Sequence, residues 1–243
     1  MHKFPLMTAH TGCMGHPDHS LISLDAALEL GADIYEDDIR VTRDGRLILA
    51  HDDRVSLHNG GEGSILAMSL EELQDEAISP PLLLETLLSV VKDAGIMMNL
   101  DLKTIACLEP LAMLIDRLDM ADQVFLSGCG YTAAFEAQLG APQLRKLLNV
   151  DVAHFHTVSY AKAVAHACAD SRATGCFGLN LPYELVQQEL LEEAHSQGLQ
   201  VYVWTVSEAD DMRRLAGMGV DAITTRELGR FLSVRAELIS GRV

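Results

Sequence analysis

The sequence has few basic residues, few aromatic residues and no long apolar run. Lysine and arginine together number 18 against 35 aspartates and glutamates, which gives a formal net charge of -17 over 243 residues. A surface of this sign repels nucleic acid and anionic lipid, so we exclude both as primary partners. Because no apolar run is long enough to span a bilayer, we also expect no stable membrane association.

The sequence also lacks the cysteine spacing of a disulfide scaffold. Its five cysteines are odd in number and include no Cys-x-x-Cys pair, so we expect a reduced, cytoplasmic chain. No signal peptide is recognisable, because an apolar strand and a histidine arrive by position 10. With no linker-like or low-complexity tract, we expect one domain over residues 1–243. Assembly of this domain into a homo-oligomer is an open alternative.

What the chain does contain is a recurring pattern, in which an amphipathic helix ends at a glycine and a short β-rich run follows. The pattern is clear at 21–36, 84–100, 184–205 and 207–225. Helices that alternate with strands of this length predict a parallel sheet with helical crossovers. We expect eight strands, near 6–10, 33–39, 96–102, 123–127, 146–150, 176–181, 200–205 and 222–225.

Eight strands favour an α/β fold that closes into a single (β/α)8 TIM-type barrel. An open, doubly wound sheet fits the periodicity almost as well. In both architectures ligands bind at the carboxyl ends of the strands, so the polar residues there are the candidates for function.

A β-hairpin extension is expected after the second strand, because Asp44-Gly45 separates two β-rich runs. If these two residues form the turn, Arg43 pairs with Arg46. The same register pairs Asp38 with His51. The hairpin would thus carry His51 back to the mouth of the barrel.

Carboxylates gather at the ends of the second and third expected strands. Strand side chains alternate between faces, so Glu36 and Asp38 point the same way, as do Asp101 and Lys103. Three inward carboxylates from neighbouring strands match one hard divalent cation with oxygen ligands. The alternative is a buried ion-pair cluster with Lys103 and Arg40.

Two histidines complete this group, since His10 ends the first expected strand and His51 arrives through the hairpin. A histidine there is placed for acid/base catalysis or metal binding, although a lone strand-end histidine is more often structural. Phosphodiester hydrolysis needs one proton removed, one proton delivered and the phosphoryl charge neutralised. Two histidines, one metal ion and Lys103 supply all three.

Several segments resemble signatures of the glycerophosphodiester phosphodiesterase family. His10-Thr11-Gly12 resembles the family's opening His-Arg-Gly, and Asn99 to Lys103 resembles Asn-Ile-Glu-Ile-Lys. The block from Glu36 to Asp52 is the most specific part of the match. Val203 to Ser207 resembles Val-Trp-Thr-Val-Asn, and the whole resemblance spans residues 8–225.

The resemblance implies a barrel fold, a small-molecule phosphodiester substrate and one divalent cation, Mg²⁺ or Ca²⁺, with Mn²⁺ as a further candidate. Family members release an alcohol and glycerol 3-phosphate. By motif match it implies metal binding by Glu36, Asp38 and Asp101, acid/base catalysis by His10 and His51, phosphate contact by Lys103, and lining of the alcohol pocket by Trp204.

The chain departs from the family pattern at the phosphate site. Thr11 stands where the family has an arginine, which removes a bidentate cationic donor and leaves a hydroxyl for substrate binding. Arg40 shares the parity of Glu36 and Asp38, and either compensates for this loss or extends past the site. Two alternative functions therefore stay open: hydrolysis of another phosphodiester, and a non-catalytic barrel that binds a phosphorylated ligand.

Two further histidine groups are open to a structural or a functional interpretation. Cys13, His16 and His19 follow His10 closely, and we favour a pocket-lining or solvent-facing loop over a second, softer metal site. His154 and His156 follow the fifth expected strand, and we favour a position away from the barrel mouth.

Overall fold

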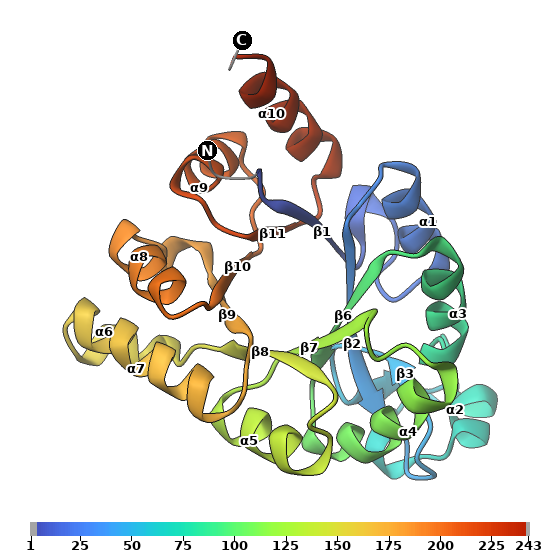
Figure 1. The fold of residues 1–243 in the computed structure, drawn as a ribbon. Coiled ribbons are helices and arrows are strands. Elements are labelled where there is room, and N and C mark those ends of the chain that lie inside the picture. Colours follow the sequence, from blue (N-terminus) through green and yellow to red (C-terminus); the bar gives the residue numbers. More distant parts are fainter. Residues whose placement is uncertain (1–3, 242–243) are drawn as a thin grey trace.

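Eight parallel strands form a closed ring in the computed structural model, which describes residues 4–241 (Figure 1). The ends of the predicted domain, residues 1–3 and 242–243, lie outside the described residues. The ring consists of β1 (Leu6–His10), β2 (Ile34–Val41), β6 (Met97–Leu102), β7 (Val124–Ser127), β8 (Arg145–Asn149), β9 (Gly178–Pro182), β10 (Gln200–Trp204) and β11 (Ala222–Thr225).

Closure of the ring depends on β1, which pairs in parallel with both the last strand and the second. Leu6 pairs with Ala222 of β11, and His10 pairs with Glu36 of β2. The fold is therefore a (β/α)8 barrel and not an open sheet. Each strand begins and ends within two residues of its predicted bounds.

Helices surround the ring and cover its outer face (Figure 1). The α-helices that follow the barrel strands are α1 (Leu21–Glu29), α3 (Leu84–Ala94), α4 (Leu108–Leu118), α5 (Tyr131–Gly140), α6 (Val152–Thr157), α7 (Tyr160–Ala173), α8 (Gln188–Ser196), α9 (Ala209–Met218) and α10 (Leu228–Ser240). Short 3-10 turns are η1 (Cys13–Gly15), η2 (Ile65–Ala67), η3 (Ile105–Cys107) and η4 (Tyr183–Leu185).

Local sequence explains where these helices begin and end. The Ser20 side chain accepts a hydrogen bond from Ser23 N and so caps the start of α1, as predicted. Helix α3 ends at Gly95, whose φ of 71° lies in the left-handed region that favours glycine. Leucine and valine side chains on one face of α3 are buried against the barrel. Within the described part of the chain, no helix is both long and apolar enough to cross a membrane.

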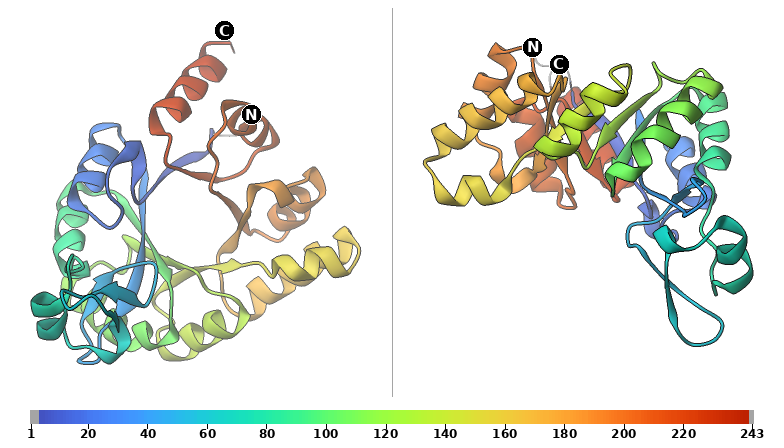
Figure 2. Two further views of the ribbon diagram at one scale, coloured as in Figure 1. Left: turned by 180° about the vertical axis from the view of Figure 1, so that it is seen from behind. Right: turned by 90° about the horizontal axis from the view of Figure 1, so that it is seen from below.

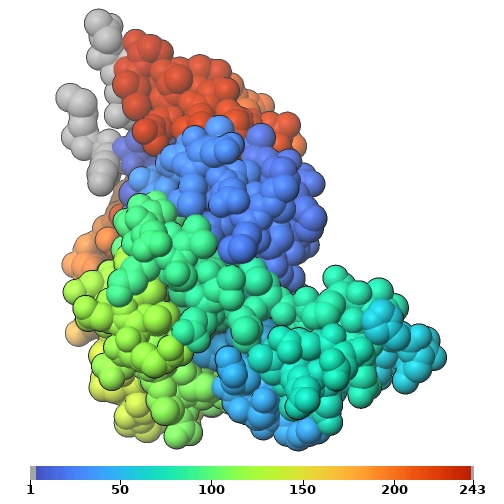
Figure 3. Space-filling view, turned by 90° about the vertical axis from the view of Figure 1, so that its right-hand side faces the viewer, coloured from blue at the N-terminus to red at the C-terminus, as the bar shows by residue number. Residues whose placement is uncertain are grey.

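The segment between β2 and α3 projects from one end of the barrel (Figures 2 and 3). It contains β3 (Leu47–Leu49), which pairs antiparallel with β2, a small ribbon of β4 (Arg54–Ser56) and β5 (Glu62–Ser64), and α2 (Leu70–Glu76). The predicted hairpin extension is therefore present.

The predicted register of this hairpin is wrong by one residue. Arg40 pairs with Ile48 and Val41 with Leu47, and Thr42 N donates to Arg46 O over 2.9 Å. The loop therefore has three residues and not two, and its last residue, Gly45, has a φ of 79°. This is the geometry of a turn followed by a glycine bulge. Asp38 consequently lies opposite Ala50 rather than His51, and Ala50 N donates to Asp38 O.

Candidate active site

A cavity of about 290 Å³ lies at the carboxyl ends of the barrel strands. The charged side chains and histidines around it come from β1, β2, the segment after β3, and the end of β6. Strands β7 to β11 contribute uncharged polar groups and one tryptophan. The lining residues are His10, Glu36, Asp38, His51, Asn99, Asp101, Lys103, Ser127, Asn149, Asn180, Trp204, Thr205 and Thr224.

Three carboxylates converge in this cavity. One oxygen from each of Glu36, Asp38 and Asp101 lies within 4.8 Å of the others. Lys103 Nζ lies 2.9 Å from Asp38 Oδ1 and 2.8 Å from Asp101 Oδ1. The neighbouring carboxylates raise the pKa of Lys103, although burial opposes this, and so keep its ammonium charged. The register aligns Asp38 with Asp101, which brings the two strand ends together.

Glu36 remains without a cationic partner in this group. It is 6% exposed, and its Oε2 atom has no hydrogen-bond partner among residues 4–241. Burial, together with the charges of Asp38 and Asp101, raises the pKa of Glu36 well above its usual value. Three carboxylates against one ammonium leave a charge of -2, and a divalent cation with oxygen ligands would neutralise it. The donor set therefore fits such an ion.

His10 lies between two groups that contact the same ring nitrogen. Its Nδ1 atom is 2.8 Å from Thr11 O and accepts a hydrogen bond from Arg226 Nε over 3.1 Å. The same atom is 3.8 Å from Glu36 Oε2. Burial lowers the pKa of His10, and the positive charge of Arg226 lowers it further. A neutral imidazole is thus favoured.

His51 lines the same cavity and is far more open to solvent, with its side chain 66% exposed. Arg40 holds the backbone there, because its Nε donates to His51 O over 2.9 Å. The His51 ring contacts Asp52, with Nδ1 3.0 Å from Oδ1. The hairpin thus brings His51 to the cavity, although its predicted register was wrong by one residue.

Thr11 and Arg40 are not among the residues that line the cavity, which departs from their predicted phosphate contact. The Thr11 side chain is buried, and its Oγ1 accepts a hydrogen bond from His19 N over 2.7 Å. The Arg40 guanidinium instead contacts the His51 backbone and Asp53. Both side chains hold loops around the site. Thr11 follows the end of β1, where strand alternation no longer applies, and Arg40, near the end of β2, reaches the segment after β3.

Sequence reasoning overlooked Arg226 and two asparagines of the cavity wall, Asn149 and Asn180. Arg226 directly follows β11 and thus lies beside His10. Its place directly after the last predicted strand, near 222–225, was the available signal for it. Asn149 is the last residue of β8, and Asn180 lies within β9. Only the register between those two strands makes the residues neighbours.

The cluster of Cys13, His16 and His19 does not form a common site. Cys13 is buried against Ser23, with its Sγ 3.4 Å from Ser23 O. His19 Nδ1 lies 2.5 Å from Asp37 Oδ1, and although burial opposes the charged ring, this hydrogen bond with Asp37 raises the pKa of His19. The loop therefore anchors to β2 from its outer side.

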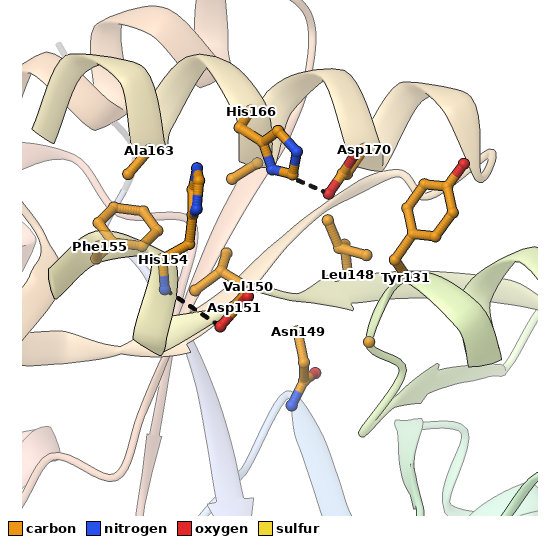
Figure 4. Close-up of a pocket in the computed structure, with 12 residues that line it drawn as sticks. Tyr131, Leu148, Asn149, Val150, Asp151, His154, Phe155, Ala163, His166 and Asp170 are labelled. Atoms are coloured by element: carbon orange, nitrogen blue, oxygen red, sulfur yellow. Dashed lines mark hydrogen bonds and ion pairs between the residues drawn. The ribbon is translucent and has the colours of Figure 1, made fainter. Parts of the chain in front are cut away.

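A second cavity, of about 220 Å³, lies between α5, α6 and α7 (Figure 4). His154 and His166 line it with ring centroids 4.7 Å apart, and His166 Nδ1 is 3.3 Å from Asp170 Oδ2. Figure 4 shows the Asn149 side chain directed away from these groups. His154 lines this second cavity and is not among the residues that line the barrel cavity, and His156 is exposed on α6.

The fold and the cavity define an α/β-barrel protein with an acidic, histidine-flanked site. The model of the "Glycerophosphoryl diester phosphodiesterase family" matches residues 10–121 and 131–229, and the chain belongs to this family. It is accordingly a phosphoric diester hydrolase.

Curated relatives and solved structures agree with this assignment. A "Glycerophosphodiester phosphodiesterase" of Caldanaerobacter subterraneus subsp. tengcongensis is 26% identical over 90% of this chain and 93% of its own length. One of Bacillus altitudinis is 26% identical over 95% and 98%. A crystal structure of the Thermotoga maritima glycerophosphodiester phosphodiesterase shares the fold, with a TM-score of 0.77 and 17% identity over 97% of this chain and 100% of that one.

A phosphodiesterase of Oleispira antarctica in complex with the product sn-glycerol-3-phosphate also has the same fold. Its TM-score is 0.78 at 20% identity, over 96% of this chain and 97% of that chain.

Proposed function

We propose that this protein hydrolyses glycerophosphodiesters to an alcohol and glycerol 3-phosphate with one divalent cation. The observation that carries the proposal is the convergence of His10, His51, Lys103 and three carboxylates on one cavity. Membership of the family and the names of the relatives support the substrate class. The substrate is a small molecule that enters from solvent.

Glu36, Asp38 and Asp101 would hold the cation. Their hard oxygen donors suit Mg²⁺ or Ca²⁺, and Mn²⁺ is a further candidate. When bound, the ion supplies positive charge that stabilises the phosphoryl oxygens. The Lys103 ammonium, held by two carboxylates at the cavity wall, provides a second positive charge for the phosphate.

The two histidines would move the protons. Burial keeps His10 neutral at neutral pH, so it is suited to take a proton from the attacking oxygen. His51, which lines the same cavity and is more open to solvent, would deliver a proton to the leaving alcohol oxygen. Arg40 orients this histidine only through the backbone, because its guanidinium donates to the His51 carbonyl.

The cysteines and the net charge bear on where the protein acts and on its partners. All five cysteines are buried free thiols, which supports the cytoplasmic location that their number and spacing suggested. The net charge of -17 supports the absence of nucleic acid among its partners.

The test measures turnover of glycerophosphocholine, glycerophosphoethanolamine and bis(p-nitrophenyl) phosphate with Mg²⁺, Ca²⁺ or Mn²⁺. His10→Ala and His51→Ala should each lower kcat by about 10²- to 10⁴-fold. His58→Ala, at an exposed histidine of the projecting segment, is the matched control and should keep full activity.

Phosphorus NMR of the products separates two routes. Attack by water gives glycerol 3-phosphate directly, whereas attack by a neighbouring substrate hydroxyl gives a cyclic phosphate first. If no diester is hydrolysed with any ion while glycerol 3-phosphate still binds, the protein is the non-catalytic barrel instead.

A further inference from the structure

The cavity wall opposite the carboxylates is uncharged and carries an oriented pair of amides. Asn149 of β8 and Asn180 of β9 are register partners, and Asn180 Nδ2 donates to Asn149 Oδ1 over 3.0 Å. Gly128 N donates to the same oxygen, also over 3.0 Å. Because Asn149 Oδ1 accepts both bonds, the orientation of each amide group is fixed.

These two bonds leave both N–H groups of Asn149, the second N–H of Asn180 and the Asn180 carbonyl oxygen for a ligand. Asn149 Nδ2 and Asn180 Oδ1 are not used in the bonds just described, and both residues line the cavity. Nearby, Trp204 Nε1 is buried and has no hydrogen-bond partner within the described chain. An alcohol hydroxyl both donates and accepts, so hydroxyl groups match this wall.

The charges of the cavity favour a neutral group on this side. Among the described lining residues, those on β7 to β11 include no carboxylate that would pair with an ammonium group and no cation that would pair with a second anion. Phosphate belongs to the other side, where Lys103 lies. A phosphodiester bound across the cavity thus places an uncharged, hydroxylated half against the amides.

We propose that Asn149 and Asn180 form a hydroxyl-recognition subsite that selects phosphodiesters with a neutral polyol half, such as glycerol, over esters without hydroxyl groups. The proposal rests on the proposed function for its substrate class, and it assigns that selectivity to two residues. A buried hydroxyl left without partners is unfavourable, so loss of the amide should penalise hydroxylated substrates specifically.

The decisive substitution is Asn180→Leu, which keeps a similar volume and removes the amide. Asn149 is the poorer choice, because its loss would also remove the hydrogen-bond acceptor of Gly128 N, which lies beside Asp101. For glycerophosphoglycerol, kcat/KM should fall by about 10- to 100-fold, whereas bis(p-nitrophenyl) phosphate, which has no hydroxyl group, should be cleaved at the wild-type rate. Asn180→Ala, which cannot overpack, should show the same split. Equal losses on both substrates, or none on either, would overturn the subsite.

A binding measurement keeps this test separate from the proposed function. Calorimetry should show that Asn180→Leu weakens glycerol 3-phosphate about tenfold or more and leaves inorganic phosphate unchanged. If the wild-type protein cleaves no diester but shows this difference, the proposed function fails and the subsite stands. If the wild type cleaves diesters and the two ligands bind both proteins equally well, the subsite fails and the function stands.

Discussion

Arg226 Nε donates a hydrogen bond to His10 Nδ1 over 3.1 Å, and the carbonyl of Thr11 lies 2.8 Å from the same nitrogen. Arginine only donates, so this contact requires an unprotonated Nδ1 and places the proton of neutral His10 on Nε2. A protonated Nδ1 would instead donate to Thr11 O. An acid/base histidine, the role proposed for His10, passes through both protonation states, and each contact suits one of them.

Arg226→Met should raise the pKa of His10, because the arginine charge helps to lower it in the folded protein. The acidic limb of the pH profile of kcat/KM would then move to higher pH. At pH 6 we expect activity to drop, because a larger fraction of His10 is then protonated. Arg226→Lys retains the charge and should keep the limb in place. An unshifted limb in Arg226→Met would show that Arg226 only holds its loop through the ion pair with Asp18.

Glu36→Gln should stabilise the metal-free protein and abolish its stabilisation by Mg²⁺. The substitution removes a buried charge whose Oε2 has no hydrogen-bond partner within residues 4–241, and it removes one ligand of the proposed cation site. Thermal unfolding in EDTA should show a Tm increase of about 2 to 4 °C for each kcal/mol gained. Asp93→Asn, at an exposed acid on α3, should behave like the wild type.

The pH dependence gives an independent check on Glu36. Its folded-state pKa is raised above 4.5, so the folded state binds more protons than the unfolded state over this range. The stability of the metal-free protein should fall as pH rises from about 4.5 through the folded-state pKa. Glu36→Gln should flatten this decline, and an unchanged slope would contradict the assignment.

His19→Gln should destabilise the protein at pH 6 by about 1 to 3 kcal/mol, the contribution of a charged hydrogen bond. The Asp37 carboxylate raises the pKa of His19, so the stabilisation is complete below 6.5 and disappears as pH rises through the folded-state pKa. Urea unfolding at pH 6 and pH 9 measures the difference. His16→Gln, in the same loop, is the control, and an equal effect of His19→Gln at both pH values would refute the charged pair.

Gly128→Ala should impair both stability and metal binding. Gly128 has a φ of 71°, and a Cβ there would lie 2.6 Å from Asp101 Oδ1 and 2.7 Å from Leu102 N. Overpacking of this kind costs about 1 to 3 kcal/mol, and the left-handed backbone adds to it. Gly130→Ala, two residues further on, meets no atom within 4 Å and should be nearly neutral. Titration of Mg²⁺ by calorimetry compares the two variants.

Much of the fold and the charged half of the site could be predicted because they depend on local periodicity. Alternation along β2 places Glu36 and Asp38 on one face, and glycines at helix ends mark where β2, β6, β10 and β11 begin. Outside regular strands, the prediction from side-chain alternation failed. Thr11 follows the end of β1 and turns toward His19, and a glycine bulge shifted the hairpin by one residue.

The sequence by itself determined the eight strands, the parity of the carboxylates and the presence of a hairpin that returns His51, since all of these follow from neighbouring residues. Only the tertiary structure decided that the sheet closes, that Arg226 meets His10 across 216 positions, and that Asn149 lies beside Asn180. Those contacts depend on which strands pair and in what register. Packing of the whole barrel fixes both, and no short segment carries that information.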